Sequence, residues 1–200
     1  MRIQSIIFLI FSFSISFAQS KQEFGSNNPE YIINTENYQK GIYYSFEEFK
    51  YNNPSKKVEA KLVNNRLQVM DSISGEFYKI DPKGIWGFSN GNQIFVLYNQ
   101  YCVLILKGRY LYFEDKGMKF NPVMVSSPTM LLAVPTGKYD KYIINFNTGN
   151  IFLLDKSIMR NILKLDDPKL LETFNKEKKK NQMLQQYISL YNTRNKARIK

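Results

Sequence analysis

A series of short apolar segments, separated by closely spaced turn signals, constrains the fold of this chain more than any other feature. The segments are rich in β-branched and aromatic side chains, which predicts strands. Pairs such as Asn-Gly, Asn-Asn and Lys-Gly lie between them, and connections this short join only antiparallel neighbours. We therefore expect an α+β fold that is mainly β: an antiparallel meander curled into a barrel-like sheet or folded as a sandwich. The predicted strands span residues 58–63, 66–70, 76–80, 85–88, 93–98, 101–106, 109–113, 130–134, 142–146 and 151–154.

Two helix starts flank the predicted strands. Ser45 is placed to cap the amide of Glu48, which predicts a short N-terminal helix near residues 45–51 whose two phenylalanines would plug the sheet. Asp167 followed by Pro168 is typical of a helix N-cap and first helical position. Because apolar spacing resumes beyond a lysine-rich stretch, one long helix with a solvated middle is expected there. Its far end would lie on its own sheet or on a partner.

Charge divides the chain near residue 155. Residues 19–155 have a net charge of +2, whereas residues 156–200 have a net charge of +8 out of the total of +11. We therefore expect an antiparallel β domain over residues 19–155 and a basic helical C-terminal segment over residues 156–200. The candidate partner-binding residues in that segment are Lys178, Lys179, Lys180, Tyr187 and Tyr191.

The N-terminal segment predicts export. Arg2 precedes an apolar run, and Ser16 and Ala18 place small residues at the −3 and −1 positions of a signal peptidase site. Residues 1–18 are therefore expected to be a cleaved signal peptide, since the run is shorter than the roughly 20 residues of a membrane span. The mature protein would have no transmembrane span, and the periplasm is the expected compartment in preference to the extracellular space.

The chain has no histidine, and this excludes much familiar catalytic chemistry, including histidine–zinc sites and ordinary serine or cysteine triads. Gly87, Ser89 and Gly91 match a nucleophile-elbow pattern, but a predicted strand follows them where a hydrolase has a helix, so we interpret them as a hairpin turn. Cys102 is expected to be a structural thiol in a strand buried on both faces. We therefore predict no catalytic, cofactor-binding or metal-binding residues, and no cofactor.

Aromatic residues provide the second hypothesis. The chain has 14 tyrosines, 15 phenylalanines and one tryptophan, and aromatic rings can stack on sugars. Trp86, Tyr110 and Tyr112 are therefore candidate ligand-binding residues, although packing between strands explains the same pattern without a ligand. We expect an exported, non-enzymatic cell-envelope protein with an interaction or structural role; the alternative is a glycan-binding or carboxylate-dependent glycan-active protein. The expected partners are an envelope protein, an anionic lipid or an envelope glycan, and not nucleic acid.

Four segments also carry a resemblance to a known group. Residues 41–55, 84–91, 108–110 and 142–149 resemble the landmarks of small uncharacterised secreted proteins from Bacteroidota, which contain a domain of unknown function. The abundance of Asn, Ile, Lys and Tyr is similar to that group as well. The resemblance implies secretion, but it implies no activity and transfers no catalytic residue.

Overall fold

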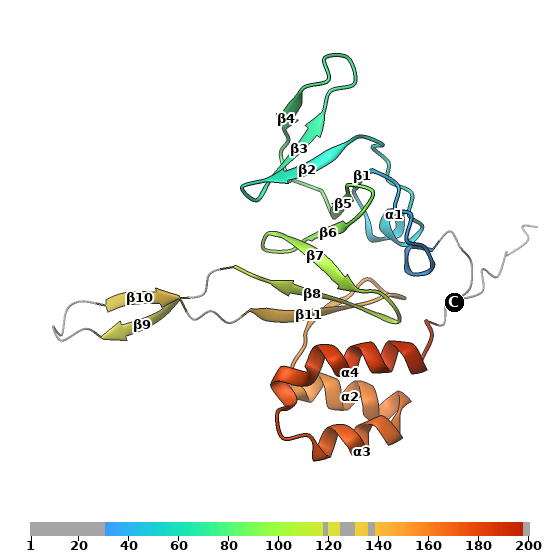
Figure 1. Ribbon diagram of the computed structural model, residues 1–200, viewed down its shortest axis with the longest axis vertical. Helices are drawn as coiled ribbons and strands as arrows, with labels where there is room; N and C mark the ends of the chain where they lie inside the picture. Colours follow the sequence, from blue (N-terminus) through green and yellow to red (C-terminus); the bar gives the residue numbers. More distant parts are fainter. Residues whose placement is uncertain (1–30, 118–119, 125–130, 136–138, 198–200) are drawn as a thin grey trace, which may run out of the picture.

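The computed structural model describes residues 31–117, 120–124, 131–135 and 139–197. A seven-stranded antiparallel sheet lies at its centre, in the order β1-β5-β6-β7-β8-β11-β12 (Figure 1). Its strands are β1 (Gly41–Tyr43), β5 (Gly87–Ser89), β6 (Ile94–Leu97), β7 (Tyr101–Leu106), β8 (Tyr110–Asp115), β11 (Asp140–Asn145) and β12 (Ile151–Leu153). The predicted α+β, mainly β class is confirmed. The end strands β1 and β12 do not pair with each other, so the sheet is open and the barrel-like closure is not confirmed.

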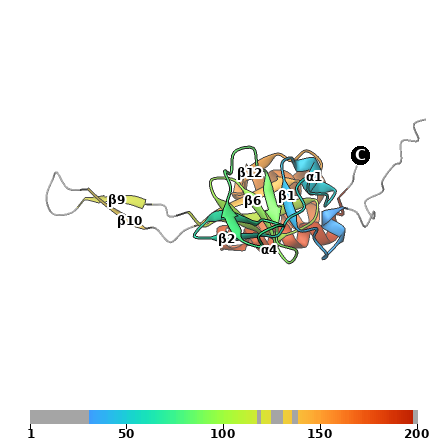
Figure 2. The same ribbon diagram turned by 90° about the horizontal axis from the view of Figure 1, so that it is seen from above.

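Two smaller antiparallel sheets accompany the central one. One contains β2 (Ala60–Val63), β3 (Arg66–Met70) and β4 (Phe77–Lys79), and the other is a hairpin of β9 (Phe120–Met124) and β10 (Leu131–Pro135). This hairpin extends away from the rest of the protein (Figure 2). The sequence did not predict β1 or β9, but every observed pairing is antiparallel, as the short connections required.

The central sheet buries apolar side chains on both faces. Leu111 and Phe113 of β8 point toward the face covered by α1 (Phe46–Lys50) and the 3-10 helix η1 (Ile32–Asn34), whereas Tyr112 points toward the opposite face. At one end of that second face lie three helices, α2 (Lys156–Asp166), α3 (Pro168–Lys176) and α4 (Lys180–Arg194), which we call the helical layer (Figure 1). At the other end lies the β2–β3–β4 sheet, whose residues pack on Phe88 and Phe95.

On the second face of the central sheet, strand β7 lies between the helical layer and the three-stranded sheet. Its Cys102 is buried in the core on the first face, as expected of a structural thiol. Val103 and Ile105, however, are 38% and 40% exposed. The prediction that this strand is buried on both faces is therefore wrong, because neither the helical layer nor the three-stranded sheet covers its middle.

The short helix α1 forms as its sequence predicts. The amide of Glu48 donates to the Ser45 hydroxyl at 3.2 Å, and the Glu48 carboxylate accepts from the amide of Tyr44 at 2.9 Å. Phe49 is completely buried and Phe46 is half-buried, both in the core of the first face. The cap thus fixes the helix where its two phenylalanines fill the space above the sheet.

The long C-terminal helix expected from the sequence is instead two helices, preceded by a third. The Asp167 cap is confirmed, since its carboxylate accepts from the amide of Leu170 at 3.1 Å. Helix α3 ends at Lys176 and α4 begins at Lys180. The break falls in the lysine-rich stretch, where no apolar side chain provides burial to hold a continuous helix. The Lys180 ammonium donates to the carbonyls of Asn175 and Glu177, which stabilises the end of α3.

The turn between β5 and β6 shows how the Gly87–Ser89–Gly91 pattern is used. The two strands form a hairpin, as predicted, and the Ser89 side chain is buried. The sequence predicts a two-residue turn centred on Asn90 and Gly91, but the structure centres it one residue later. The amide of Asn90 donates to the carbonyl of Gln93 at 3.2 Å, and of the two central residues only Gly91 has a positive φ, of 95°. The buried serine at the end of a strand lacks the exposure that a nucleophile elbow gives its hydroxyl.

Candidate functional site

The helical layer and its α3–α4 connection carry a group of exposed cationic side chains. We call this group the basic surface; it comprises Lys156, Arg160, Lys164, Lys169, Lys176, Lys178 and Lys179. None of these seven forms an ion pair with another described residue. Their charges are therefore available to an external anion.

The packing of the helical layer explains why its cations face outward. Leu170 and Phe174 of α3 and Leu184, Ile188 and Tyr191 of α4 are buried in one core with the second face of the sheet. Because the apolar positions of each helix are used inward, the lysines on the remaining positions lie in solvent. Of the two alternatives that the sequence left open, its own sheet or a partner, the far end of the C-terminal segment packs on its own sheet.

The structure separates the five predicted partner-binding residues into two groups. Lys178 and Lys179 are exposed, whereas Lys180 is half-buried with its ammonium bonded to backbone carbonyls. Tyr187 and Tyr191 are only 4% and 0% exposed. The two tyrosines therefore belong to the core, and their helical spacing reflects the burial of one side of α4 against the sheet.

A polar network joins Tyr191 to the sheet. Its hydroxyl donates to the carboxylate of Asp166 at 2.7 Å, and the same carboxylate forms an ion pair with Arg109 at 3.0 Å. Burial, followed by the hydrogen bond to the Asp166 carboxylate, raises the pKa of the Tyr191 hydroxyl. The tyrosine thus stays neutral and fastens α4 to α2 and to the turn before β8.

The three aromatic residues predicted to bind a ligand do not share a surface. Trp86 packs against Phe46 and Phe49 on the first face, with ring centroids 5.6 and 4.4 Å away. Tyr112 is completely buried beneath the helical layer, and Tyr110 is half-buried against Tyr191 at 5.7 Å. Alternation along β8 places both tyrosines on one face, as the sequence indicated, but Trp86 lies on the other.

A different cluster brings an exposed ring close to carboxylates. Tyr98, in the β6–β7 turn, is 42% exposed and its ring centroid lies 4.6 Å from that of Tyr142. The Tyr142 hydroxyl donates to Asp140 at 3.4 Å. The side-chain amides of Asn99 and Gln100 donate to the buried carboxylate of Asp115 at 2.8 and 2.7 Å. We call these six residues the Tyr98 cluster.

Sequence reasoning missed the Tyr98 cluster because its members come from three separated segments. Only the register of β8 with β11, which pairs Asp115 with Asp140, brings two of those segments together. The sequence indicates a turn at Asn99 and Gln100, but it does not indicate that their side-chain amides bond Asp115.

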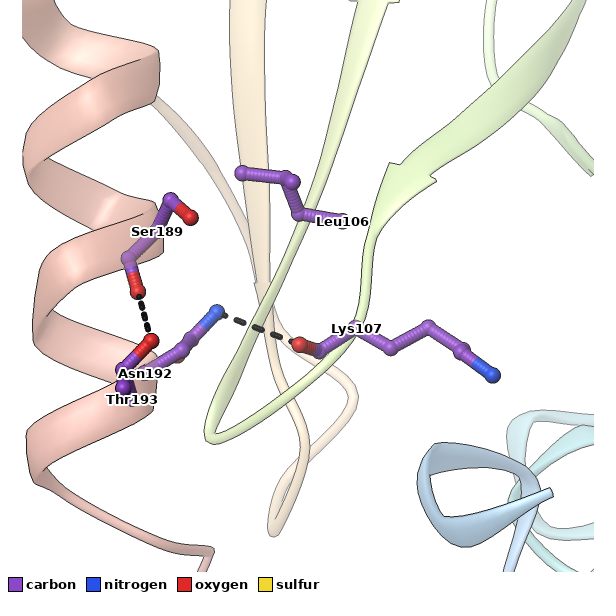
Figure 3. A pocket seen from close by; sticks show the side chains of 5 residues that line it. All are labelled: Leu106, Lys107, Ser189, Asn192 and Thr193. Carbon is purple, nitrogen blue, oxygen red and sulfur yellow. Dashed lines mark hydrogen bonds between the residues drawn. The ribbon is translucent and has the colours of Figure 1, made fainter. Parts of the chain in front are cut away.

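A shallow cavity of about 270 Å³ lies between the β7–β8 turn and α4 (Figure 3). Its lining residues are Leu106, Lys107, Ser189, Asn192 and Thr193. The Asn192 side chain is already used, since it accepts from the amide of Tyr110 at 3.0 Å and donates to the carbonyl of Tyr110 at 2.7 Å. The hydroxyl of Thr193 donates to the carbonyl of Ser189 in its own helix at 3.0 Å. The polar lining thus serves the attachment of α4.

Two further properties bear on candidate sites. Within the described ranges, no helix is long and apolar enough to cross a membrane. The same part of the chain contains no group of three or more Cys, Asp or Glu side chains placed to hold a metal ion.

Comparison with known proteins adds the family to this geometry. A family model described as a family of unknown function (DUF6563) matches residues 41–195, from β1 to the end of α4. Comparisons with curated proteins and with solved structures found no match. The matched region contains the central sheet, the three-stranded sheet and the helical layer together. The chain therefore belongs to the DUF6563 family, whose function is unknown.

Proposed function

We propose that this protein is an exported, non-enzymatic component of the cell envelope that binds an anionic partner through its basic surface. The observation that carries the proposal is the division of the helical layer: its aromatic and aliphatic side chains pack inward, and its exposed cations form no ion pair with the residues that the structure describes. Export follows from the predicted signal peptide at residues 1–18, with the periplasm as the proposed compartment. A folded layer presents its charges in fixed positions, which favours a surface-binding role over that of a solvated tail.

The positive charge of the basic surface indicates the chemical class of the partner. Seven cations on a folded layer match a dense array of phosphate or carboxylate groups, such as an anionic lipid headgroup layer or an acidic envelope glycan. Leu165, which is 82% exposed at the end of α2, lies beside Lys164 in the sequence and adds an apolar contact. An exposed apolar side chain near cations supports an anionic lipid surface as the partner.

Charge reversal with a matched control tests the proposal. The variant K176E/K178E/K179E changes the basic surface, and K57E/K79E/K83E makes the same change of net charge at exposed lysines in and around the three-stranded sheet. Co-sedimentation with vesicles of phosphatidylglycerol and phosphatidylcholine, and chromatography on heparin, measure binding to a lipid and to an acidic glycan. We expect the first variant to lose at least tenfold in affinity for one of these probes and the second to lose less than threefold. Equal losses would show that net charge alone drives binding, and the basic surface would then have no specific role.

Removal of residues 156–200 would not isolate the role of the basic surface. The helical layer covers Tyr112 and Ile143 of the central sheet, so deletion would expose a core cluster and destroy the fold together with the charge. Point substitutions at exposed lysines leave that core intact.

The Tyr98 cluster supports a second candidate function, glycan binding. An exposed tyrosine ring beside amides and carboxylates is a common way to hold a sugar, with the ring on one sugar face and polar groups on its hydroxyls. This cluster, unlike Trp86, Tyr110 and Tyr112, offers an exposed ring beside polar side chains; because the Asn99 and Gln100 amides already donate to Asp115, the Tyr98 ring is the main group offered to a sugar. Thermal shift against neutral envelope glycans tests it: a saturable rise in wild type that is lost in Tyr98→Ala supports binding, and no response to any glycan counts against it.

A further inference from the structure

Strand β12 forms one end of the central sheet and leaves its outer edge open. Within the described ranges, β12 pairs with β11 alone. Its three residues are Ile151, Phe152 and Leu153, and the last two are 39% and 50% exposed. Because neighbouring residues of a strand point to opposite faces, these two side chains place apolar surface on both sides of the edge.

Among the residues that the structure describes, the other edges of the two larger sheets are covered or carry a lysine, whereas β12 has neither protection. The outer side of β1 is covered where the amide of Ile42 donates to the carbonyl of Lys56 at 2.9 Å. Strands β2 and β4 carry the exposed lysines Lys61 and Lys79. Charged or covered edges are the usual means by which proteins prevent strand addition. An uncharged, uncovered edge is therefore a candidate interaction surface.

The hydrogen-bond register shows which backbone groups of β12 face outward. The amide of Asn145 donates to the carbonyl of Asn150, and the amide of Leu154 donates to the carbonyl of Lys141. In an antiparallel ladder the bonded pairs alternate, so Phe152 also uses its backbone groups toward β11. The amides and carbonyls of Ile151 and Leu153 consequently point away from the sheet.

This edge is complementary to itself. When two copies of β12 are placed antiparallel about Phe152, Ile151 of each lies opposite Leu153 of the other, and both residues present outward donors and acceptors. Four backbone hydrogen bonds then form about a twofold axis, and the exposed apolar side chains cover one another. We propose that β12 pairs with β12 of a second copy in this register, which joins the two central sheets into one continuous sheet.

Proline substitution at the edge tests the pairing while sparing the fold. The amide of Leu153 points outward, so Leu153→Pro removes two of the four bonds between copies and none of those to β11. The matched control is Lys79→Pro on β4. In the β3–β4 ladder the amide of Ile80 donates to the carbonyl of Leu67, and the amide of Asp71 donates to the carbonyl of Glu76. Because bonded pairs alternate along the ladder, the Lys79 amide also faces outward. Light scattering after size exclusion should give twice the chain mass for wild type and Lys79→Pro, and the monomer mass for Leu153→Pro. Far-ultraviolet circular dichroism checks that both variants fold.

A disulfide identifies the register. On the proposed axis the two Phe152 residues form a non-hydrogen-bonded antiparallel pair, whose Cα atoms lie about 4.5 Å apart, within the range that a disulfide spans. Phe152→Cys should therefore give a covalent dimer on mild oxidation, and the buried Cys102 should not contribute. A wild-type protein that stays monomeric at 100 µM would overturn the proposal, as would a dimer that survives Leu153→Pro and forms no disulfide through residue 152.

Discussion

Replacement of the partly exposed Asn192 by alanine should lower the free energy of unfolding more than most substitutions at partly exposed positions do. Its side chain bonds both backbone groups of Tyr110, at the start of β8, and thereby attaches α4 to the central sheet. The neighbouring Gly108 confirms how closely the two elements approach, since a Cβ added there would lie 2.5 Å from the Asn192 side chain.

The magnitude follows from the hydrogen bonds that are lost. The amide of Phe146 donates to the carbonyl of Arg109, so the backbone groups of Tyr110 point away from β11 and depend on Asn192. Each bond contributes about 1 kcal/mol net, and a half-buried amide and carbonyl left without partners add to the cost. We expect Asn192→Ala to lower the free energy of unfolding by about 2 kcal/mol. Asn192→Asp should cost at least as much, because a carboxylate would then face the Tyr110 carbonyl.

Urea unfolding followed by circular dichroism measures this loss as a shift of the midpoint to lower urea at unchanged slope. Thr193→Ala is the matched control: its hydroxyl bonds only within α4, and its removal should change stability by less than about 0.5 kcal/mol. A loss below about 0.5 kcal/mol for Asn192→Ala would refute the claim that this side chain attaches the helical layer.

Three further perturbations test the core. The Tyr101 hydroxyl is buried with no hydrogen-bond partner among the described residues, and burial raises its pKa to about 12. The phenol therefore stays neutral in the folded protein, and its contribution to the free energy of unfolding, complete below about pH 10, is lost as the pH rises toward 12. Tyr101→Phe should reduce the loss of stability between pH 7 and pH 11, measured by urea unfolding. An unchanged loss of stability would refute its assignment to Tyr101. Burial raises the pKa of the Cys102 thiol to about 11, so a thiol reagent at pH 8 should label it only after unfolding, and rapid labelling of the native protein would contradict its burial. Gly41→Ala should lower the melting temperature by several degrees, because a Cβ would lie 2.3 Å from the Lys56 carbonyl at a φ of +150°, whereas Gly75→Ala, with open space around it, should cost less.

Local signals were predictable from the sequence because their causes are local. The caps at Ser45 and Asp167 depend on residues three positions apart, and both form. Most strands were found for the same reason, since alternation and turn chemistry are properties of short segments. The register that joins these strands, and the opening of the sheet at β1 and β12, depend on contacts between distant segments and were not predictable.

The candidate site shows the same limit more sharply. Helical spacing correctly identified Tyr187 and Tyr191 as one apolar side of a helix, but a stripe does not specify whether it meets a partner or its own sheet. Alternation along β8 separated Tyr110 and Tyr112 from the core of the first face, but it could not reveal that a helical layer covers them. Charge was a better guide to exposure, because charged side chains favour solvent, and Lys178 and Lys179 are exposed.

A fluorophore placed on the helical layer tests the binding proposal most directly. Lys178 and Lys79 are both exposed, on opposite covers of the second face, and the buried Cys102 leaves an introduced cysteine as the reactive thiol. An environment-sensitive probe on Lys178→Cys should shift to shorter wavelength when phosphatidylglycerol vesicles or heparin are added, and the same probe on Lys79→Cys should not. Equal shifts at the two positions, or a shift at Lys79→Cys alone, would contradict binding through the basic surface.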